Sequence, residues 1–220
     1  MDAEALFRLV RAATGQTLVM VLLSTVFSVI LGLPLGIILC VTSPEGGIAP
    51  RPVLNQAVSR IVNTMRSFPF IILMILLFPL SRLIVGTAIG TRATIVPLSI
   101  AAAPFVARVI ETALKEVNPG VIAAARAMGS TNMQIIRKVL LPEALPALVS
   151  GVTLTIINLI GYSAMAGAIG GGGLGDLAIR YGYQRFRPGV MAAAVVVIIV
   201  LVEVIQFAGS KLSARLMAKR

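Results

Sequence analysis

Apolar residues run along this chain in five long stretches that contain few or no charged side chains. A helix needs about 20 such residues to cross the hydrocarbon core of a bilayer, and isolated charges near its ends can reach the interface. The pattern therefore predicts five transmembrane helices, at about 17–41, 61–81, 91–110, 145–169 and 188–209. We expect an all-α integral membrane protein.

Composition supports this assignment and narrows the chemistry. Hydrophobic residues make up 58% of the chain and charged residues 12%, whereas a soluble domain carries about 25% charged residues. With one cysteine, Cys40, and no histidine, the chain lacks the usual ligands of transition metals and cannot form an internal disulfide. We expect this chain to bind no metal and no cofactor.

The basic residues indicate how the chain sits in the membrane. The net charge is +11, but most Lys and Arg stand singly between apolar stretches and no nucleic-acid-binding motif is present, so we expect no nucleic acid partner. Lys and Arg are more frequent after spans one, three and five than in the other connections. Because cytoplasmic loops carry this excess, residues 1–16 are expected outside and the basic tail, 210–220, in the cytoplasm.

The cytoplasmic connection between spans three and four has clear helix signals over 118–142. Asn118 followed by Pro119 is an N-cap with proline at the first helical position, and Gly129 is expected to end that helix. Thr131 and Gln134 have the spacing of a capping box, which opens a second short helix.

This second helix is expected to end at Pro142, before Pro146 enters span four. The connection is thus predicted to be a compact pair of helices hinged at a glycine. The alternative is an amphipathic helix pair that lies on the membrane surface.

The same connection resembles the EAA loop of binding-protein-dependent ABC importer permeases. The register of Ala123-Ala124-Ala125, then Gly129, then Leu141-Pro142 is that of the family, although Ala123 stands where the family has Glu. The resemblance implies a coupling-helix loop that docks on a cytoplasmic ATPase. The coupling residues it implies are Ala123, Ala124, Ala125, Arg126, Gly129, Leu141 and Pro142.

A second resemblance extends over nearly the whole chain. The segments 159–175, 180–184, 66–71, 101–105 and 205–209 are similar to the permeases of methionine importers. This resemblance implies a homodimer in the bacterial inner membrane, two ABC ATPase subunits that bind ATP and Mg, and a substrate-binding lipoprotein that delivers D- or L-methionine. An importer of another small solute, such as glycine betaine or another amino acid, is the alternative, because the coupling loop is shared across substrates.

Two features within the predicted spans are candidates for function. Small and polar residues of span four share one helical face, and we weigh ordinary helix packing against a pathway-lining role in which Met165 acts as a gate. The residues of this face are Gly151, Thr155, Asn158, Tyr162 and Met165. Glu203 stands alone in span five, where we favour a structural ion pair with a basic residue on a neighbouring span over a proton relay.

Enzymatic activity of this chain is not expected. The run of glycines at 170–175 contains no lysine, so it is not a P-loop, and a flexible, closely packed outer loop is its expected structure. An intramembrane hydrolase would need a paired nucleophile and base, which the spans do not contain. Energy for transport would have to come from the partner ATPase.

Overall fold

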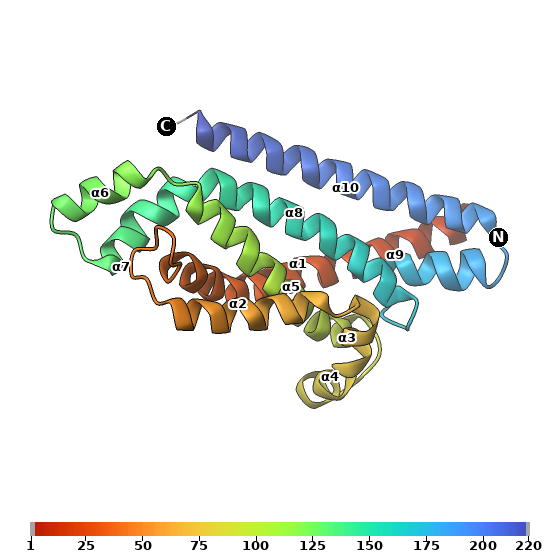
Figure 1. The fold of residues 1–220 in the computed structure, drawn as a ribbon. Helices are drawn as coiled ribbons and strands as arrows, with labels where there is room; N and C mark the ends of the chain where they lie inside the picture. Colours follow the sequence, from red (N-terminus) through yellow and green to blue (C-terminus); the bar gives the residue numbers. More distant parts are fainter. Residues whose placement is uncertain (1–2, 219–220) are drawn as a thin grey trace.

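The computed structural model describes residues 3–218, which form an elongated bundle of helices without β-strands (Figure 1). The two ends of the chain lie at opposite ends of the bundle (Figure 1). The elements are α1 (Ala3–Val41), α2 (Pro52–Ser67), α3 (Phe70–Leu76), α4 (Phe78–Val85), α5 (Thr91–Lys115), α6 (Pro119–Ala127), α7 (Asn132–Ile135), the π-helix η1 (Ile136–Leu140), α8 (Leu141–Gly167), α9 (Gly173–Asp176), the π-helix η2 (Leu177–Tyr183) and α10 (Pro188–Met217).

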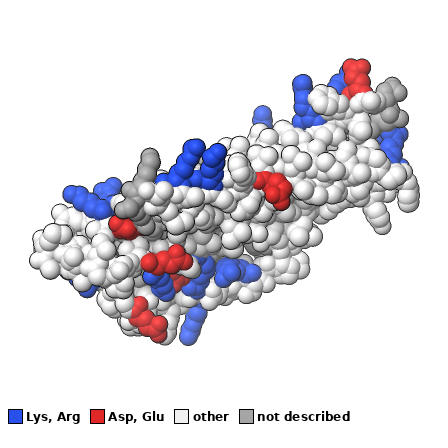
Figure 2. Space-filling model, turned by 90° about the horizontal axis from the view of Figure 1, so that it is seen from above, with Lys and Arg blue, Asp and Glu red and all other residues white. Residues whose placement is uncertain are grey.

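Four helices in the described chain are long and apolar enough to cross a membrane, and a fifth span is available if the bent pair α2 and α3 is counted as one. The four are α1, α5, the continuous helix Asn132–Gly167 and α10. Most of the face seen in Figure 2 is uncharged, and its Lys, Arg, Asp and Glu side chains stand in small separate groups. The membrane-protein assignment and the all-helical class are therefore confirmed.

The predicted second span, 61–81, is wrong as a single helix. Helix α2 begins nine residues earlier, at Pro52, and the chain bends by 100° between α2 and α3. The cause is Pro69, which lacks a backbone donor and disfavours the helical conformation of Phe68, whose ψ of 131° is extended. A further break follows at Leu77, and Gly86, with φ of 82°, ends α4.

Each of the other spans extends beyond one of its predicted ends, because bilayer thickness sets only the minimum length of a spanning helix. Helix α1 starts at Ala3 and includes nearly all of the predicted extracytoplasmic segment. Helix α5 continues to Lys115 and α10 to Met217, so most of the basic tail is helical. The outermost residues of both predicted termini, 1–2 and 219–220, lie outside the described residues.

Helices α1 and α5 pack at very close range, through two glycines four residues apart. A Cβ atom added to Gly32 would lie 2.7 Å from Val106 Cγ1, and one added to Gly36 would lie 2.7 Å from the carbonyl oxygen of Ala107. This small-xxx-small pattern lets the two backbones approach each other, as is common between helices in a bilayer.

The glycine run at 170–175 is closely packed, as expected, but its second half is helical and forms the start of α9. Two side chains of α1 bind the first turn of α9. Gln16 Oε1 accepts from the Gly173 amide and Thr17 Oγ1 accepts from the Leu174 amide, both at 2.9 Å. These two side chains satisfy amide groups at the N-terminus of α9 that have no partner within their own helix.

Glu203 does not form the expected ion pair with a neighbouring span within the described part of this chain. Its side chain is exposed because it lies on the face of α10 that is turned away from the bundle. The ion-pair assignment is therefore wrong for contacts within one copy of the chain.

Candidate ATPase-coupling loop and translocation pathway

The coupling loop lies at one end of the bundle, together with the connection between α1 and α2 and the end of α10 (Figure 1). Its first helix, α6, starts as predicted. The Asn118 side chain accepts from the Gly120 amide at 2.8 Å, and Pro119 occupies the first turn. This cap fixes where α6 begins, independently of the rest of the fold.

Gly129 ends α6 in a Schellman motif. Its φ is 79°, its amide donates to the Arg126 carbonyl at 2.9 Å, and the Ser130 amide donates to the Ala125 carbonyl at 3.1 Å. No atom lies within 4 Å of where a Cβ would be placed on Gly129, so the requirement for glycine comes from the left-handed backbone and not from crowding.

The capping box that follows is also confirmed. The Thr131 amide donates to Gln134 Oε1 at 2.8 Å, and the Gln134 amide donates to Thr131 Oγ1 at 3.4 Å. Only four residues therefore separate the end of α6 from the start of α7. The result is a rigid turn between two helices.

The predicted end of the second helix at Pro142 is wrong. Helix α7 runs through η1 into α8 as one continuous helix, Asn132–Gly167. In η1 the Leu141 amide bonds to the Ile136 carbonyl, five residues back. This wider π-turn directly before Pro142 lets the helix continue past a residue that has no donor. The coupling loop is therefore joined to the membrane span by a continuous helix.

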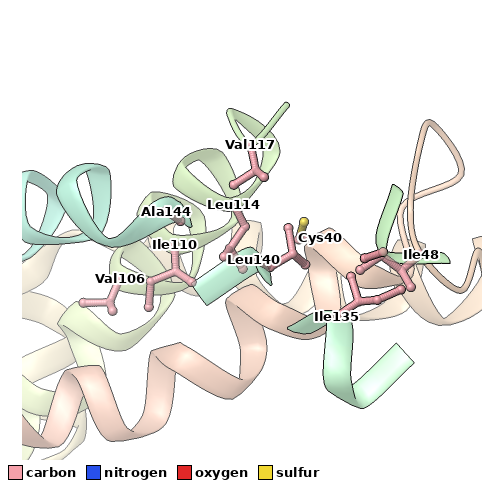
Figure 3. Close-up of a cluster of buried hydrophobic side chains, with 10 residues drawn as sticks. Cys40, Ile48, Val106, Ile110, Leu114, Val117, Ile135, Leu140 and Ala144 are labelled. Carbon is pink, nitrogen blue, oxygen red and sulfur yellow. The ribbon is translucent and has the colours of Figure 1, made fainter. Parts of the chain in front are cut away.

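One residue of the Ala-Ala-Ala segment anchors α6 to the bundle. Ala125 is 3% exposed and belongs to a cluster of buried apolar side chains from α1, α5, α7 and α8 (Figure 3). Ala123, Ala124 and Gly129 are exposed on the other side of α6 and its end, whereas Leu141 is partly buried and Pro142 is exposed. The loop thus has an inner face that packs on the bundle and an outer face that is exposed.

Arg126 makes a contact that the sequence did not indicate. Its guanidinium donates to the backbone carbonyl of Ile48, in the connection between α1 and α2, and the Ile48 side chain lies against Ile135 in the same apolar cluster (Figure 3). This connection is itself tied to α1, since the Ala49 amide donates to the Val41 carbonyl at 3.0 Å. No local spacing signal could reveal a hydrogen bond between residues 78 positions apart.

A buried ion-pair network on α5 reaches α2 through Arg108. Glu111, with a side chain 9% exposed, pairs with Arg108 at 2.6 Å and with Lys115 at 2.7 Å. Arg108 also donates to the Ser59 hydroxyl and to Asn63 Oδ1 on α2. A charge at this depth requires such partners, and Glu111 has two.

The predicted polar face of α8 divides into two environments. Gly151 and Thr155 are buried, and a Cβ on Gly151 would lie 2.1 Å from Val109 Cγ1 of α5, so these two positions serve helix packing. Asn158 and Tyr162 are partly buried, and Met165 is 47% exposed. Gly151 and Thr155 therefore lie in a helix interface, whereas Asn158 and Tyr162 are only partly covered and Met165 is exposed on this chain.

Tyr162 has a partner that the spacing pattern could not show. Its ring stacks on Phe70 of α3, with the centroids 4.5 Å apart and the planes 7° from parallel. Within residues 3–218, no three His, Cys, Asp or Glu side chains gather in an arrangement that could hold a metal ion.

Comparison with known proteins places this geometry in a family. Residues 32–217 match the binding-protein-dependent transport system inner membrane component. A probable D-methionine transport system permease protein of Vibrio cholerae is 54% identical over 207 residues, which span 94% of this chain and 92% of that protein. The D-methionine transport system permease protein of Escherichia coli K12 is 52% identical over 165 residues, 75% of this chain and 76% of that protein.

Solved structures agree with the sequence relatives. An inward-facing structure of the MetNI methionine ABC transporter superposes with a TM-score of 0.95 at 48% identity, over 98% of this chain and 99% of that chain. An amino acid ABC transporter with histidines has a TM-score of 0.72 at 21% identity, which shows a shared fold. This chain belongs to the family of inner membrane components of binding-protein-dependent transport systems.

Proposed function

We propose that this chain is the permease subunit of an ATP-driven importer that moves methionine, as the D or the L isomer, across the bacterial inner membrane. The main support is the 54% identity to a probable D-methionine permease over 94% of the chain. The permease would act as a homodimer with two cytoplasmic ABC ATPase subunits, which bind ATP and Mg, and with a substrate-binding lipoprotein outside the membrane. Lipid surrounds it, and no nucleic acid takes part.

The coupling loop would carry the force of ATP binding into the membrane. In this proposal the ATPase closes on the exposed face of α6, where Ala123, Ala124 and Gly129 lie. Movement of α6 would reach the spans through Ala125 in the apolar cluster and through the continuous helix that contains Leu141 and Pro142. Arg126 would keep α6 attached to the α1–α2 connection during this movement.

Methionine uptake tests the substrate. A strain that depends on this system for methionine is expected to lose high-affinity uptake of radiolabelled methionine when the chain is deleted, and to regain it when the chain is returned on a plasmid. Measuring glycine betaine and lysine uptake in the same strains provides the comparison. Unchanged methionine uptake together with lost uptake of betaine or lysine would assign the chain to another substrate.

Two introduced cysteines test the orientation, in which the amino terminus is outside and the carboxyl terminus is cytoplasmic. Cys40 is 8% exposed, so it gives little background labelling. Met128, 79% exposed within the coupling loop, and Phe186, 87% exposed between η2 and α10, are suitable positions. The connection of η2 to α10 lies at the opposite end of the bundle from α6 (Figure 1). In intact cells we expect a membrane-impermeant maleimide to label Phe186→Cys and to spare Met128→Cys until the membrane is opened. The reverse pattern would invert the topology.

Met165 is the proposed gate of the pathway, together with Asn158 and Tyr162 on the open part of α8. In a homodimer, the exposed Met165 thioether could meet the second copy and close a narrow path. Replacing Met165 with Ala is expected to raise solute leak or basal ATP hydrolysis of the reconstituted complex. Wild-type behaviour in both assays would leave Met165 with a packing role only.

A further inference from the structure

Arg66 occupies an unusual place in the fold. It lies in the last turn of α2, directly before the 100° bend into α3. The cavity beside it is lined by Ala101 and Phe105 of α5. At 1.5 Å rise per residue, Ala101 is about 15 Å from the start of α5 and Phe105 is about 15 Å from its end. Arg66 therefore lies near the middle depth of the bundle.

The guanidinium of Arg66 has no hydrogen bond and no ion pair within residues 3–218. Arg108, the neighbouring arginine on α5, is held by Glu111, Ser59 and Asn63. A charged side chain at membrane depth is costly and normally faces a partner or a wet cavity. Arg66 thus presents an unused site for an anion.

Two cavities flank Arg66, and both are also lined by Phe105. One, of about 140 Å³, lies in the elbow of α2 and α3, and the other, of about 290 Å³, extends along α5. The wall of the smaller cavity is aromatic: Phe68, Phe70 and Tyr162 line it, and the last two are the stacked pair. The smaller cavity is therefore lined by both the Arg66 guanidinium and aromatic rings.

This combination suits a particular ligand chemistry. An arginine guanidinium binds a carboxylate through two parallel hydrogen bonds, and a thioether makes favourable contacts with aromatic rings. We propose that the elbow is a transient binding subsite for the translocated amino acid, with Arg66 on its carboxylate and its apolar side chain against Phe70 and Tyr162. The proposal rests on the proposed function, since it assumes that the solute is methionine.

A photoactivatable methionine that carries a diazirine on its side chain tests the subsite directly. The permease and ATPase complex, in lipid nanodiscs without the binding lipoprotein, is irradiated with this probe, and the labelled peptides are identified by mass spectrometry. We expect labels on the peptides that contain Phe70 and Tyr162. Unlabelled L-methionine should compete with the probe and reduce this labelling, whereas methioninol, which lacks the carboxylate, should not.

Two variants of α2 sharpen the test. Arg66→Gln is expected to reduce the competed labelling at least tenfold, while the complex still inserts and co-purifies with its ATPase. Arg66 and Arg60 are both exposed on this chain, but only Arg66 lines the two cavities. Arg60→Gln is therefore expected to leave labelling and basal ATP hydrolysis unchanged. Equal labelling of Arg66→Gln and the wild type, or competition by methioninol, would overturn the assignment.

A second copy of this chain could instead supply the missing anion, and Glu203 is an exposed carboxylate on α10. If Glu203→Gln and Arg66→Gln weaken the dimer equally and non-additively, the arginine serves an intersubunit ion pair and the subsite is overturned. Methionine transport by the wild-type complex with its lipoprotein distinguishes failure of the proposed subsite from failure of the proposed function. Methionine transport without labelling at the elbow would overturn the subsite alone, and no methionine transport would overturn the proposed function as well.

Discussion

Replacing Gly129 with Glu is expected to abolish solute-stimulated ATP hydrolysis while leaving the protein in the membrane. A left-handed residue other than glycine carries about 1–3 kcal/mol of strain, and the Gly129 φ of 79° is in that region. The Schellman bonds around Gly129 would be lost or distorted, so α6 would leave its position. Because about 1.4 kcal/mol corresponds to a tenfold change in an equilibrium, this strain corresponds to a loss of coupling of roughly 5- to 140-fold. The measurement is ATPase stimulation by methionine and the lipoprotein in proteoliposomes.

Three control variants separate backbone strain from the added charge. Gly129→Asn is expected to keep more coupling than Gly129→Ala, because asparagine tolerates the left-handed conformation better. Met128→Glu puts the same charge one residue earlier, where φ is −79° and the side chain is 79% exposed, without any strain. If Met128→Glu matches Gly129→Glu and both uncharged variants behave as the wild type, the charge and not the backbone is decisive.

A second perturbation of α6 provides an independent check of the same loop. Ala125→Pro would remove a backbone donor from the interior of α6, which destabilises a helix by about 3 kcal/mol, and would crowd a side chain that is 3% exposed. If coupling survived both this change and Gly129→Glu, the loop would not be the coupling element. Co-purification with the ATPase shows whether the variant still docks on it. A variant that co-purifies but lacks solute-stimulated ATP hydrolysis has lost only the coupling to the membrane spans.

The parts of this loop that the sequence predicts correctly are those governed by neighbouring residues. The Asn118 cap, the end of α6 at Gly129 and the Thr131–Gln134 box each depend on contacts no more than five residues apart. The five apolar stretches are equally local, because each is a run of neighbouring residues long enough to cross a bilayer. These features made the all-helical membrane-protein class predictable.

The remaining features depend on context that a linear pattern does not contain. Pro69 breaks α2 from α3, whereas Pro142 is absorbed in a π-turn and Pro97 and Pro104 lie inside α5, so the residue type alone does not decide the outcome. The contacts of Arg126 with Ile48 and of Tyr162 with Phe70 join distant segments. The spacing of residues along α8 predicts which of them share one helical face. Which residues of this face are buried and which are exposed depends on where α5 lies.

The contact between α1 and α5 leads to the second large effect, on stability. Gly36→Leu is expected to destabilise the permease severely, since an added Cβ would lie 2.7 Å from both the Ala107 carbonyl oxygen and Ile110 Cβ. A backbone oxygen on a packed helix cannot move aside as a flexible side chain can, so the two helices would have to separate. Overpacking of this kind costs about 3 kcal/mol or more.

Gly15→Leu is the matched control, because it lies on the same helix and no atom is within 4 Å of its added Cβ. We expect Gly36→Leu to lower the thermal midpoint of the solubilised complex by roughly 5–10 °C or to prevent its accumulation, and Gly15→Leu to behave as the wild type. Size-exclusion chromatography after heating measures both. Because the end of α1 also carries the connection that receives Arg126, separation of α1 from α5 should reduce methionine-stimulated ATP hydrolysis even in protein that remains folded. Equal stability of the two leucine variants would mean that the α1–α5 contact is looser than the glycine spacing requires.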